Sequence, residues 1–176
     1  MSVTLTPQQL TRFAAALADQ ENGDSKPQVC VIADSPNLTK SAAEVYGKLA
    51  RPDLKAALRL AKTYGAIHEA QMVANPGLPI WVARQWERIG FNVNIGLAPD
   101  CDDRAVRQCV SALLVADVLI CMGGDHHFID IVRLAKQSRR EIKVVVVSVR
   151  ECTAACLLDD CDEFVDLPVA VYPQAA

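Results

Sequence analysis

The run IKVVVVSV, residues 142–149, constrains the fold more than any other segment of the chain. It contains four consecutive valines and shows no alternation of apolar and polar positions. A strand with one face in water alternates, whereas a strand covered on both faces of a parallel sheet is continuously apolar. The run therefore predicts a buried strand in a parallel sheet, and parallel strands need long crossover connections, usually helices.

The rest of the chain supplies such crossovers, because strand-like and helix-like segments alternate from residue 28 onward. This alternation predicts an α/β fold in which a mostly parallel sheet lies between two layers of helices. The expected strands are 28–34, 66–74, 91–98, 117–125, 142–149 and, as a candidate last strand, 163–169. The expected helices are 52–65, 78–90, 102–116, 126–139 and 151–160.

Length and composition place the chain among ordinary globular proteins. It has 176 residues, 51% of them hydrophobic and 22% charged, which fits one domain with its own core and argues against disorder. The net charge is −3, so binding of a nucleic acid would need a local basic patch. No apolar run reaches the roughly 20 residues that span a membrane, and the start of the chain lacks a signal-peptide pattern. We predict a cytoplasmic protein with no membrane partner, whose seven cysteines are free thiols.

The first residues predict a helix that is separate from the alternating pattern. Thr6 and Gln9 fit a capping box with Pro7 in the first turn, and apolar residues then recur at helical spacing over 10–17. A polar stretch with Gly and Pro follows. We therefore divide the chain into an N-terminal helix and linker, 1–27, and a main domain, 28–176.

Acidic residues follow three of the predicted strands. Asp34 ends the first and Asp125 ends the fourth, and after the third come Asp100, Asp102 and Asp103. In open α/β sheets ligands bind beyond the carboxyl ends of the strands, so these carboxylates should share one edge of the sheet. Carboxylates gathered in one place repel one another unless a cation lies between them, and Mg²⁺ or Mn²⁺ takes oxygen ligands. A metal held there could activate water for attack on a phosphate.

Each of these residues also has a purely structural interpretation. Asp125 could cap the following helix, and Asp34 could form a turn before Ser35 and Pro36. Asp102 and Asp103 could be first-turn acids that meet the helix dipole. His126 and His127, which follow Asp125, could be metal ligands or could serve by packing and hydrogen bonding.

Four short motifs, in order along residues 28–168, resemble the NYN domain family of the PIN-like nuclease superfamily. They are ADSPNL at 33–38, CDDRAV at 101–106, GGDHHF at 123–128 and CDEFVDL at 161–167. The resemblance implies a three-layer, PIN-like (Rossmann-like) domain with a central, mostly parallel five-stranded sheet. It also implies metal-dependent cleavage of RNA.

Carried over to this chain, the resemblance assigns site residues. Asp34 and Asp125 would be the central metal-binding and catalytic acids, and Asp103 or Asp102 would be the third. Asn37 would orient the site or the substrate phosphate.

Basic residues near the same edge could hold the RNA phosphates. They are Lys40, Arg104 and Arg107. RNA, single-stranded or structured, is thus the expected partner. A homodimer through a sheet edge or the N-terminal helix is compatible with the sequence, although no residue pattern establishes one.

The chain departs from the family pattern at two places. His127 stands where the family has a second acid, and neither Gln108 nor Cys109 supplies the acid expected on the helix after the third strand. Histidine can ligate Mn²⁺ or Zn²⁺ but suits Mg²⁺ poorly. Two hypotheses follow: a nuclease in which His127 is a ligand or a proton carrier, and a degenerate domain that binds RNA or a protein partner without cutting.

Overall fold

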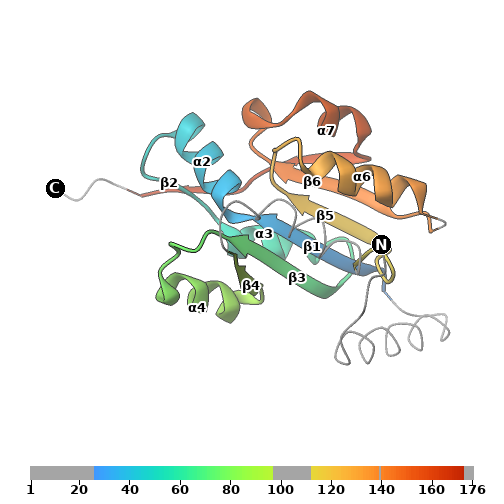
Figure 1. The fold of residues 1–176 in the computed structure, drawn as a ribbon, viewed down its shortest axis with the longest axis horizontal. Helices are drawn as coiled ribbons and strands as arrows, with labels where there is room; N and C mark the ends of the chain where they lie inside the picture. Colours follow the sequence, from blue (N-terminus) through green and yellow to red (C-terminus); the bar gives the residue numbers. More distant parts are fainter. Residues whose placement is uncertain (1–25, 97–111, 139, 173–176) are drawn as a thin grey trace.

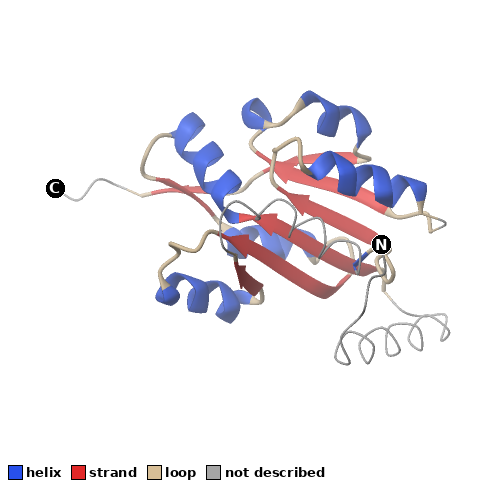
Figure 2. Ribbon diagram, in the orientation of Figure 1, coloured by secondary structure: helices blue, strands red, loops and turns tan. Residues whose placement is uncertain are grey.

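The computed structural model describes residues 26–96, 112–138 and 140–172, and it has the α/β architecture that the alternation predicts (Figures 1 and 2). Its main sheet has six strands in the order β4-β3-β1-β5-β6-β7, and every neighbouring pair is parallel. The strands are β1 Gln28–Asp34, β3 Ala66–Ala74, β4 Asn92–Ile95, β5 Val118–Met122, β6 Lys143–Ser148 and β7 Glu163–Asp166.

Helices cover both faces of this sheet. One face packs against α2, Ser35–Tyr46, α3, Leu54–Ala61, and α4, Ile80–Ile89. The other face packs against α6, Phe128–Gln137, and α7, Ala155–Asp160, which follows a short 3₁₀ turn at Arg150–Cys152. The three-layer prediction is confirmed.

Strand β6 shows why the valine run constrains the fold. Val144 and Val146 pack into the core beneath α6 and α7, whereas Val145 and Val147 pack into the core beneath α2 and α3. All four side chains are fully buried. Neither face of the strand meets water, so neither face needs polar residues.

The strand order creates a point where the connections reverse direction. Numbered along the chain, the six strands lie in the order 3-2-1-4-5-6, the order of doubly wound dinucleotide-binding folds. The reversal falls between β1 and β5, which pair in register from Val29 with Val118 to Ala33 with Met122. Ligand sites in such folds lie in the crevice beyond the carboxyl ends of these two strands.

Three features differ from the sequence prediction. The sheet has six strands rather than five. The segment 163–169 is not one strand: β7 ends at Asp166, and β8, Val169–Val171, pairs antiparallel with β2, Ala50–Pro52, in a separate small sheet.

Helix α2 is the third difference, because its apolar residues show no helical period and no helix was predicted there. Its buried residues are Ser35, Leu38, Ser41 and Ala42, so its buried face is small or polar at three of four positions. Its start does carry a signal, since the carboxylate of Asp34 caps the helix and a proline lies in the first turn.

Several predictions fall on residues that the structure does not describe. These are the helix over 7–18, most of the helix over 102–116, and the candidate residues Asp100, Asp102, Asp103, Arg104 and Arg107. Within the described ranges, no helix has the length and apolar character needed to cross a membrane.

Candidate functional site

The carboxyl ends of β1 and β5 carry the residues that the sequence singles out. Strand β1 ends at Asp34, which is 8% exposed, and β5 leads into Gly123, Gly124 and Asp125. The two strands are neighbours at the reversal point of the sheet. The structure therefore brings the ADSPNL and GGDHHF motifs to the same edge, as predicted.

Hydrogen bonds join the two motifs across the reversal point. The amide of Asn37 donates to Oδ1 of Asp34 at 3.1 Å, and the amide of Gly124 donates to Oδ1 of Asn37 at 2.8 Å. Asn37, the predicted substrate-orienting residue, thus fixes the loop after β5 against the start of α2. Lys40, the predicted phosphate ligand on α2, is exposed to solvent.

Gly124 occupies a position that only glycine fits. A Cβ atom there would lie 2.7 Å from Oγ of Ser148, 2.8 Å from the carbonyl oxygen of Cys152 and 3.0 Å from Cα of Thr153. The Gly124 carbonyl also accepts a 2.8 Å hydrogen bond from the amide of Ala154. The loop that carries Asp125 is consequently clamped between α2 and the segment after β6.

Asp125, His126 and His127 form a compact polar group on this loop. Oδ1 of Asp125 lies 2.7 Å from Nδ1 of His126 and 2.9 Å from Nδ1 of His127. The two imidazole rings are 4.0 Å apart between centroids, and the side chain of His126 is 71% exposed. One ligand atom from each residue falls within 4.8 Å of the others, a spacing that could hold a metal ion.

The surroundings of Asp125 favour its ionised form. Partial burial raises the pKa of Asp125, but the backbone amide and ring of His127, together with the ring of His126, outweigh it and lower the pKa below its ordinary value. A carboxylate that accepts an Nδ1–H hydrogen bond fixes an imidazole in the tautomer whose lone pair is on Nε2, the arrangement common around metal-binding histidines. Asp125 can therefore act either as a direct ligand or as the group that orients the histidines.

Asp34 lies on the neighbouring strand but is not a member of this group. Its carboxylate caps α2, which is a structural role, although the sequence suggested a turn before Ser35 and Pro36 rather than a helix cap. Asp125 is not the N-cap of α6, because that position belongs to His127 and no side chain caps the helix.

The sequence leaves the role of His126 open between metal ligation and packing, and the structure groups its ring with Asp125 and His127. Sequence reasoning missed Ser148, at the end of β6. Its Oγ is buried and has no hydrogen-bond partner within the described residues, and it lies against Gly124. Nothing in the sequence distinguishes Ser148 from an ordinary strand residue.

Cys121, in the middle of β5, is not part of any reactive site. It is fully buried, and burial raises the pKa of its thiol to about 12. The thiolate needed for nucleophilic attack is therefore absent at neutral pH.

Comparison with known proteins supports the fold. No protein-family model and no curated protein matches the chain. The crystal structure of a protein of unknown function from Vibrio parahaemolyticus superposes with a TM-score of 0.75 at 21% sequence identity, over 82% of this chain and 95% of that one. The two chains share an architecture, and the function of this chain has to be argued from its own residues.

Proposed function

We propose that this chain is a metal-dependent ribonuclease of the NYN/PIN-like class that hydrolyses RNA phosphodiester bonds. The observation that carries the proposal is the group of Asp125, His126 and His127 at the reversal point of the sheet. An ionised carboxylate and two imidazoles within ligand distance of one another form a donor set for a divalent cation. Their position is where doubly wound folds bind phosphate-containing ligands.

The three residues of this group fit some metals better than others. Mg²⁺ prefers an all-oxygen shell, whereas imidazole suits Mn²⁺ or Zn²⁺. With two histidines and one carboxylate, this group favours Mn²⁺ over Mg²⁺ as the activating ion. A bound divalent ion would lower the pKa of a water ligand and polarise a phosphoryl oxygen.

The chain's own residues have distinct tasks in this scheme. Asp125 holds or orients the ligands, and the clamp between Asn37 and Gly124 keeps the loop in place. Asp34, on the adjacent strand, adds negative charge at the same edge. An acid at Asp103 or Asp102 would complete the site as the family resemblance implies.

The test is cleavage of end-labelled single-stranded RNA in Mn²⁺ and in Mg²⁺. We expect cutting in Mn²⁺ that exceeds cutting in Mg²⁺, and a loss of about 100-fold or more in Asp125→Asn, since a metal ligand contributes several kcal/mol to the transition state. Asp130→Asn is the matched control, because this acid lies exposed in the first turn of α6. Cutting that survives in Asp125→Asn, or that fails in wild type with both metals, would reject the nuclease proposal.

A second function is favoured by one observation. The carboxylate of Asp34 is engaged in capping α2, so the described metal group contains a single carboxylate. This arrangement suits a degenerate domain that binds RNA or a protein partner in a regulatory role. Retention of RNA by the wild-type protein without cleavage in either metal would support it.

A further inference from the structure

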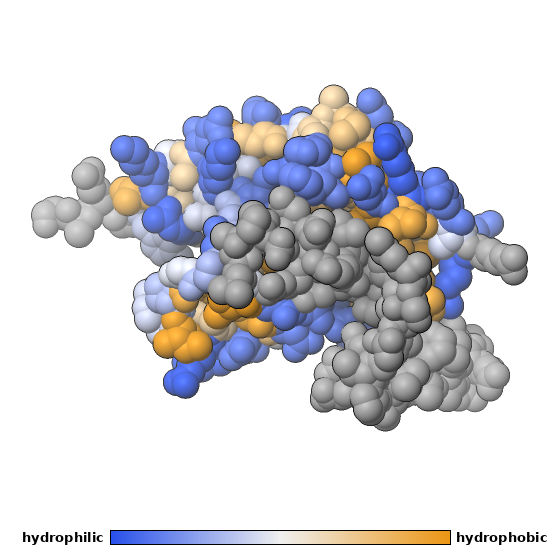
Figure 3. Space-filling view, in the orientation of Figure 1, coloured by the Kyte–Doolittle hydropathy of each residue, from blue (hydrophilic) through white to orange (hydrophobic). Residues whose placement is uncertain are grey.

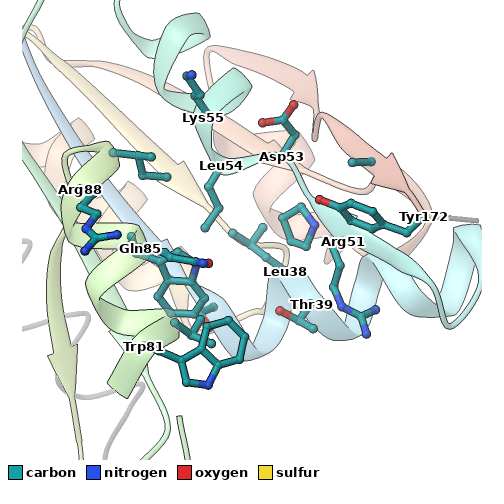
Figure 4. Close-up of a pocket in the computed structure, with 16 residues that line it drawn as sticks. Leu38, Thr39, Arg51, Asp53, Leu54, Lys55, Trp81, Gln85, Arg88 and Tyr172 are labelled. Atoms are coloured by element: carbon teal, nitrogen blue, oxygen red, sulfur yellow. The ribbon is translucent and has the colours of Figure 1, made fainter. Parts of the chain in front are cut away.

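A groove lies on the α2 side of the sheet, and helix α4, one of its walls, carries both hydrophobic and hydrophilic residues at its surface (Figure 3). The groove has a volume of about 750 Å³, and its walls come from α2, the start of α3, α4 and the small β2–β8 sheet. Figure 4 shows Trp81, Gln85 and Arg88 along α4 on one side, Arg51 and Tyr172 on the other, and Leu38 and Leu54 between them. The groove is therefore open, with an apolar floor and polar walls.

Exposed aromatic side chains line this groove. Trp81 is 62% exposed, and Tyr172, just after β8, is also exposed. Trp86 lies one turn further along α4 and packs partly into the core. Trp81, in contrast, contributes little to the core of this chain. Flat, exposed aromatic rings beside a groove are suitable surfaces for nucleobase stacking.

The groove is also more basic than the chain as a whole. Arg51, Lys55 and Arg88 line it, and within the described residues no carboxylate pairs with any of them. The acid among the lining residues is Asp53, whose Oδ1 accepts the amide of Ala56 at 2.8 Å as the cap of α3.

Three positive charges thus face one negative charge, on a chain whose net charge is −3. A local basic surface on an acidic protein is complementary to an anion. Arg51 is already fixed at the rim, because its Nη1 donates to the carbonyls of Lys48 and Ala50, each at 2.7 Å.

Helix α2 connects the groove to the candidate metal site. Ser35, the first residue of α2, lines the groove and directly follows Asp34. Leu38 and Thr39 line the groove, whereas Asn37 contacts the loop of Asp125 through Gly124. A strand of RNA bound at the metal site would have to cross only one helix to enter the groove.

We propose that this groove binds an unpaired nucleotide of single-stranded RNA, with the base stacked on Trp81 and the phosphates held by Arg51, Lys55 and Arg88. As a subsite of a ribonuclease, the assignment rests on the proposed function, but the binding itself needs neither a metal nor Asp125. Stacking tolerates any base, so the subsite would select unpaired RNA rather than a sequence.

The test is binding of a short, end-labelled oligouridylate, followed by fluorescence anisotropy in the presence of EDTA. We expect Trp81→Ala to bind at least about tenfold more weakly than wild type, because a stacking aromatic contributes that much or more per base. Ile80→Ala is the matched control, since Ile80 is 63% exposed on the same helix and does not line the groove. Both side chains are exposed, so neither variant should affect folding.

Charge variants provide a second measurement. The double variant Lys55→Gln/Arg88→Gln should weaken binding and flatten its dependence on salt, because fewer counterions are released from the RNA. Equal binding by Trp81→Ala and wild type would overturn the assignment, as would binding that ignores both salt and the charge variants. The latter result would mean that Lys55 and Arg88 do not hold the phosphates.

The outcomes separate this proposal from the one before it. RNA binding in EDTA that depends on Trp81, with no cleavage in Mn²⁺, would retain the groove and reject the nuclease. Cleavage that needs Asp125, with binding indifferent to Trp81, would retain the nuclease and reject the groove.

Discussion

Acids lie at both ends of the strands of the main sheet, here called the amino-end edge and the carboxyl-end edge, but the partners of these acids differ. At the amino end of the strands, Asp117, Asp162 and Glu163 each have a lysine or arginine partner. Arg140 pairs with Asp117 at 2.9 Å, Lys143 pairs with Glu163 at 2.7 Å, and Lys136 pairs with Asp162. At the carboxyl end, the ion-pair partners that the structure describes for Asp125 are His126 and His127.

Two acids of the amino-end edge also accept hydrogen bonds from backbone amides near the starts of strands. Asp117 accepts the amide of Gln28 at 2.8 Å, and Asp162 accepts the amide of Val144 at 2.7 Å. These carboxylates accept hydrogen bonds from backbone amides that are not paired within the sheet, so their role is structural.

Asp125 differs because its partners can themselves bind a metal ion. The ring nitrogens of imidazole are metal ligands, whereas the charged groups of lysine and arginine have only donors to offer. An acid at a strand end therefore indicates a candidate metal site only when its partners can also bind the metal. Substitutions at the two ends of the strands test this distinction.

The largest effect should come from Gly124→Ala at the carboxyl-end edge. The added methyl group would press on Ser148 and on the backbone of Cys152 and Thr153, so we expect unfolding free energy to fall by about 1–3 kcal/mol. The stabilisation of the protein by Mn²⁺ should shrink as well, because the displaced loop carries Asp125. Urea denaturation with and without Mn²⁺ measures both quantities.

Gly77→Ala is the control for this change. A Cβ atom at Gly77 meets nothing within 4 Å, so this variant should stay within about 0.5 kcal/mol of wild type. If both glycines tolerate alanine equally, the loop after β5 is not clamped, and the geometry inferred for the metal group loses its support.

Much of this carboxyl-end edge could be predicted from the sequence. The apolar runs locate β1 and β5, and a parallel sheet sends their ends to one edge, so Asp34 and Asp125 were placed together correctly. The identity of that edge as a reversal point needed the strand order, which periodicity does not contain.

Other features could not be predicted, for physical reasons. Helix α2 buries Ser35 and Ser41 against the sheet, so it lacks the apolar period that identifies a helix. The bond between Asn37 and Gly124 joins residues 87 positions apart, and only the folded sheet brings them together. Whether Asp34 caps a helix or binds a metal is likewise a matter of side-chain geometry.

A change of similar or smaller size is expected at the amino-end edge. Asp162→Ala removes the acceptor of the Val144 amide and the partner of Lys136, so unfolding free energy should fall by about 1–3 kcal/mol, the cost of leaving a buried donor unsatisfied. Thermal or urea denaturation measures it, with Asp159→Ala, an exposed acid on α7, as the control.

The same variant tests the contrast between the edges. Asp162→Ala should keep the wild-type response to Mn²⁺, since Asp162 does not belong to the group of Asp125. A lost metal response in this variant would mean that the two edges are not independent.

The smallest effect is expected from Tyr64→Phe, also at the amino-end edge. The hydroxyl of Tyr64 donates to Glu163 at 2.6 Å, and Lys143 lies over the ring at 5.0 Å from its centroid. Phenylalanine keeps the ring beneath Lys143 and removes only the hydroxyl. We expect a loss of about 0.5–1.5 kcal/mol at pH 8, typical of one hydrogen bond.

The pH dependence of this loss identifies its origin. Burial, with help from the hydrogen bond and the charge of Glu163, raises the pKa of Tyr64 to about 12. A raised pKa stabilises the fold fully below the unfolded value of about 10, and the contribution disappears as pH rises from there through the folded value. The difference between wild type and Tyr64→Phe should therefore be constant from pH 7 to about pH 9 and shrink above about pH 10.

Urea denaturation of both proteins across this range provides the measurement. Tyr46→Phe is the control, because Tyr46 is exposed at the end of α2. Effects of alkali on lysines are common to all three proteins and cancel in the difference. A difference that persisted unchanged above about pH 12 would show that the hydroxyl acts by packing rather than by donating a proton to Glu163. Tyr64 would then stabilise the amino-end edge by packing, and the contrast with the carboxyl-end edge would rest on Asp117 and Asp162 alone.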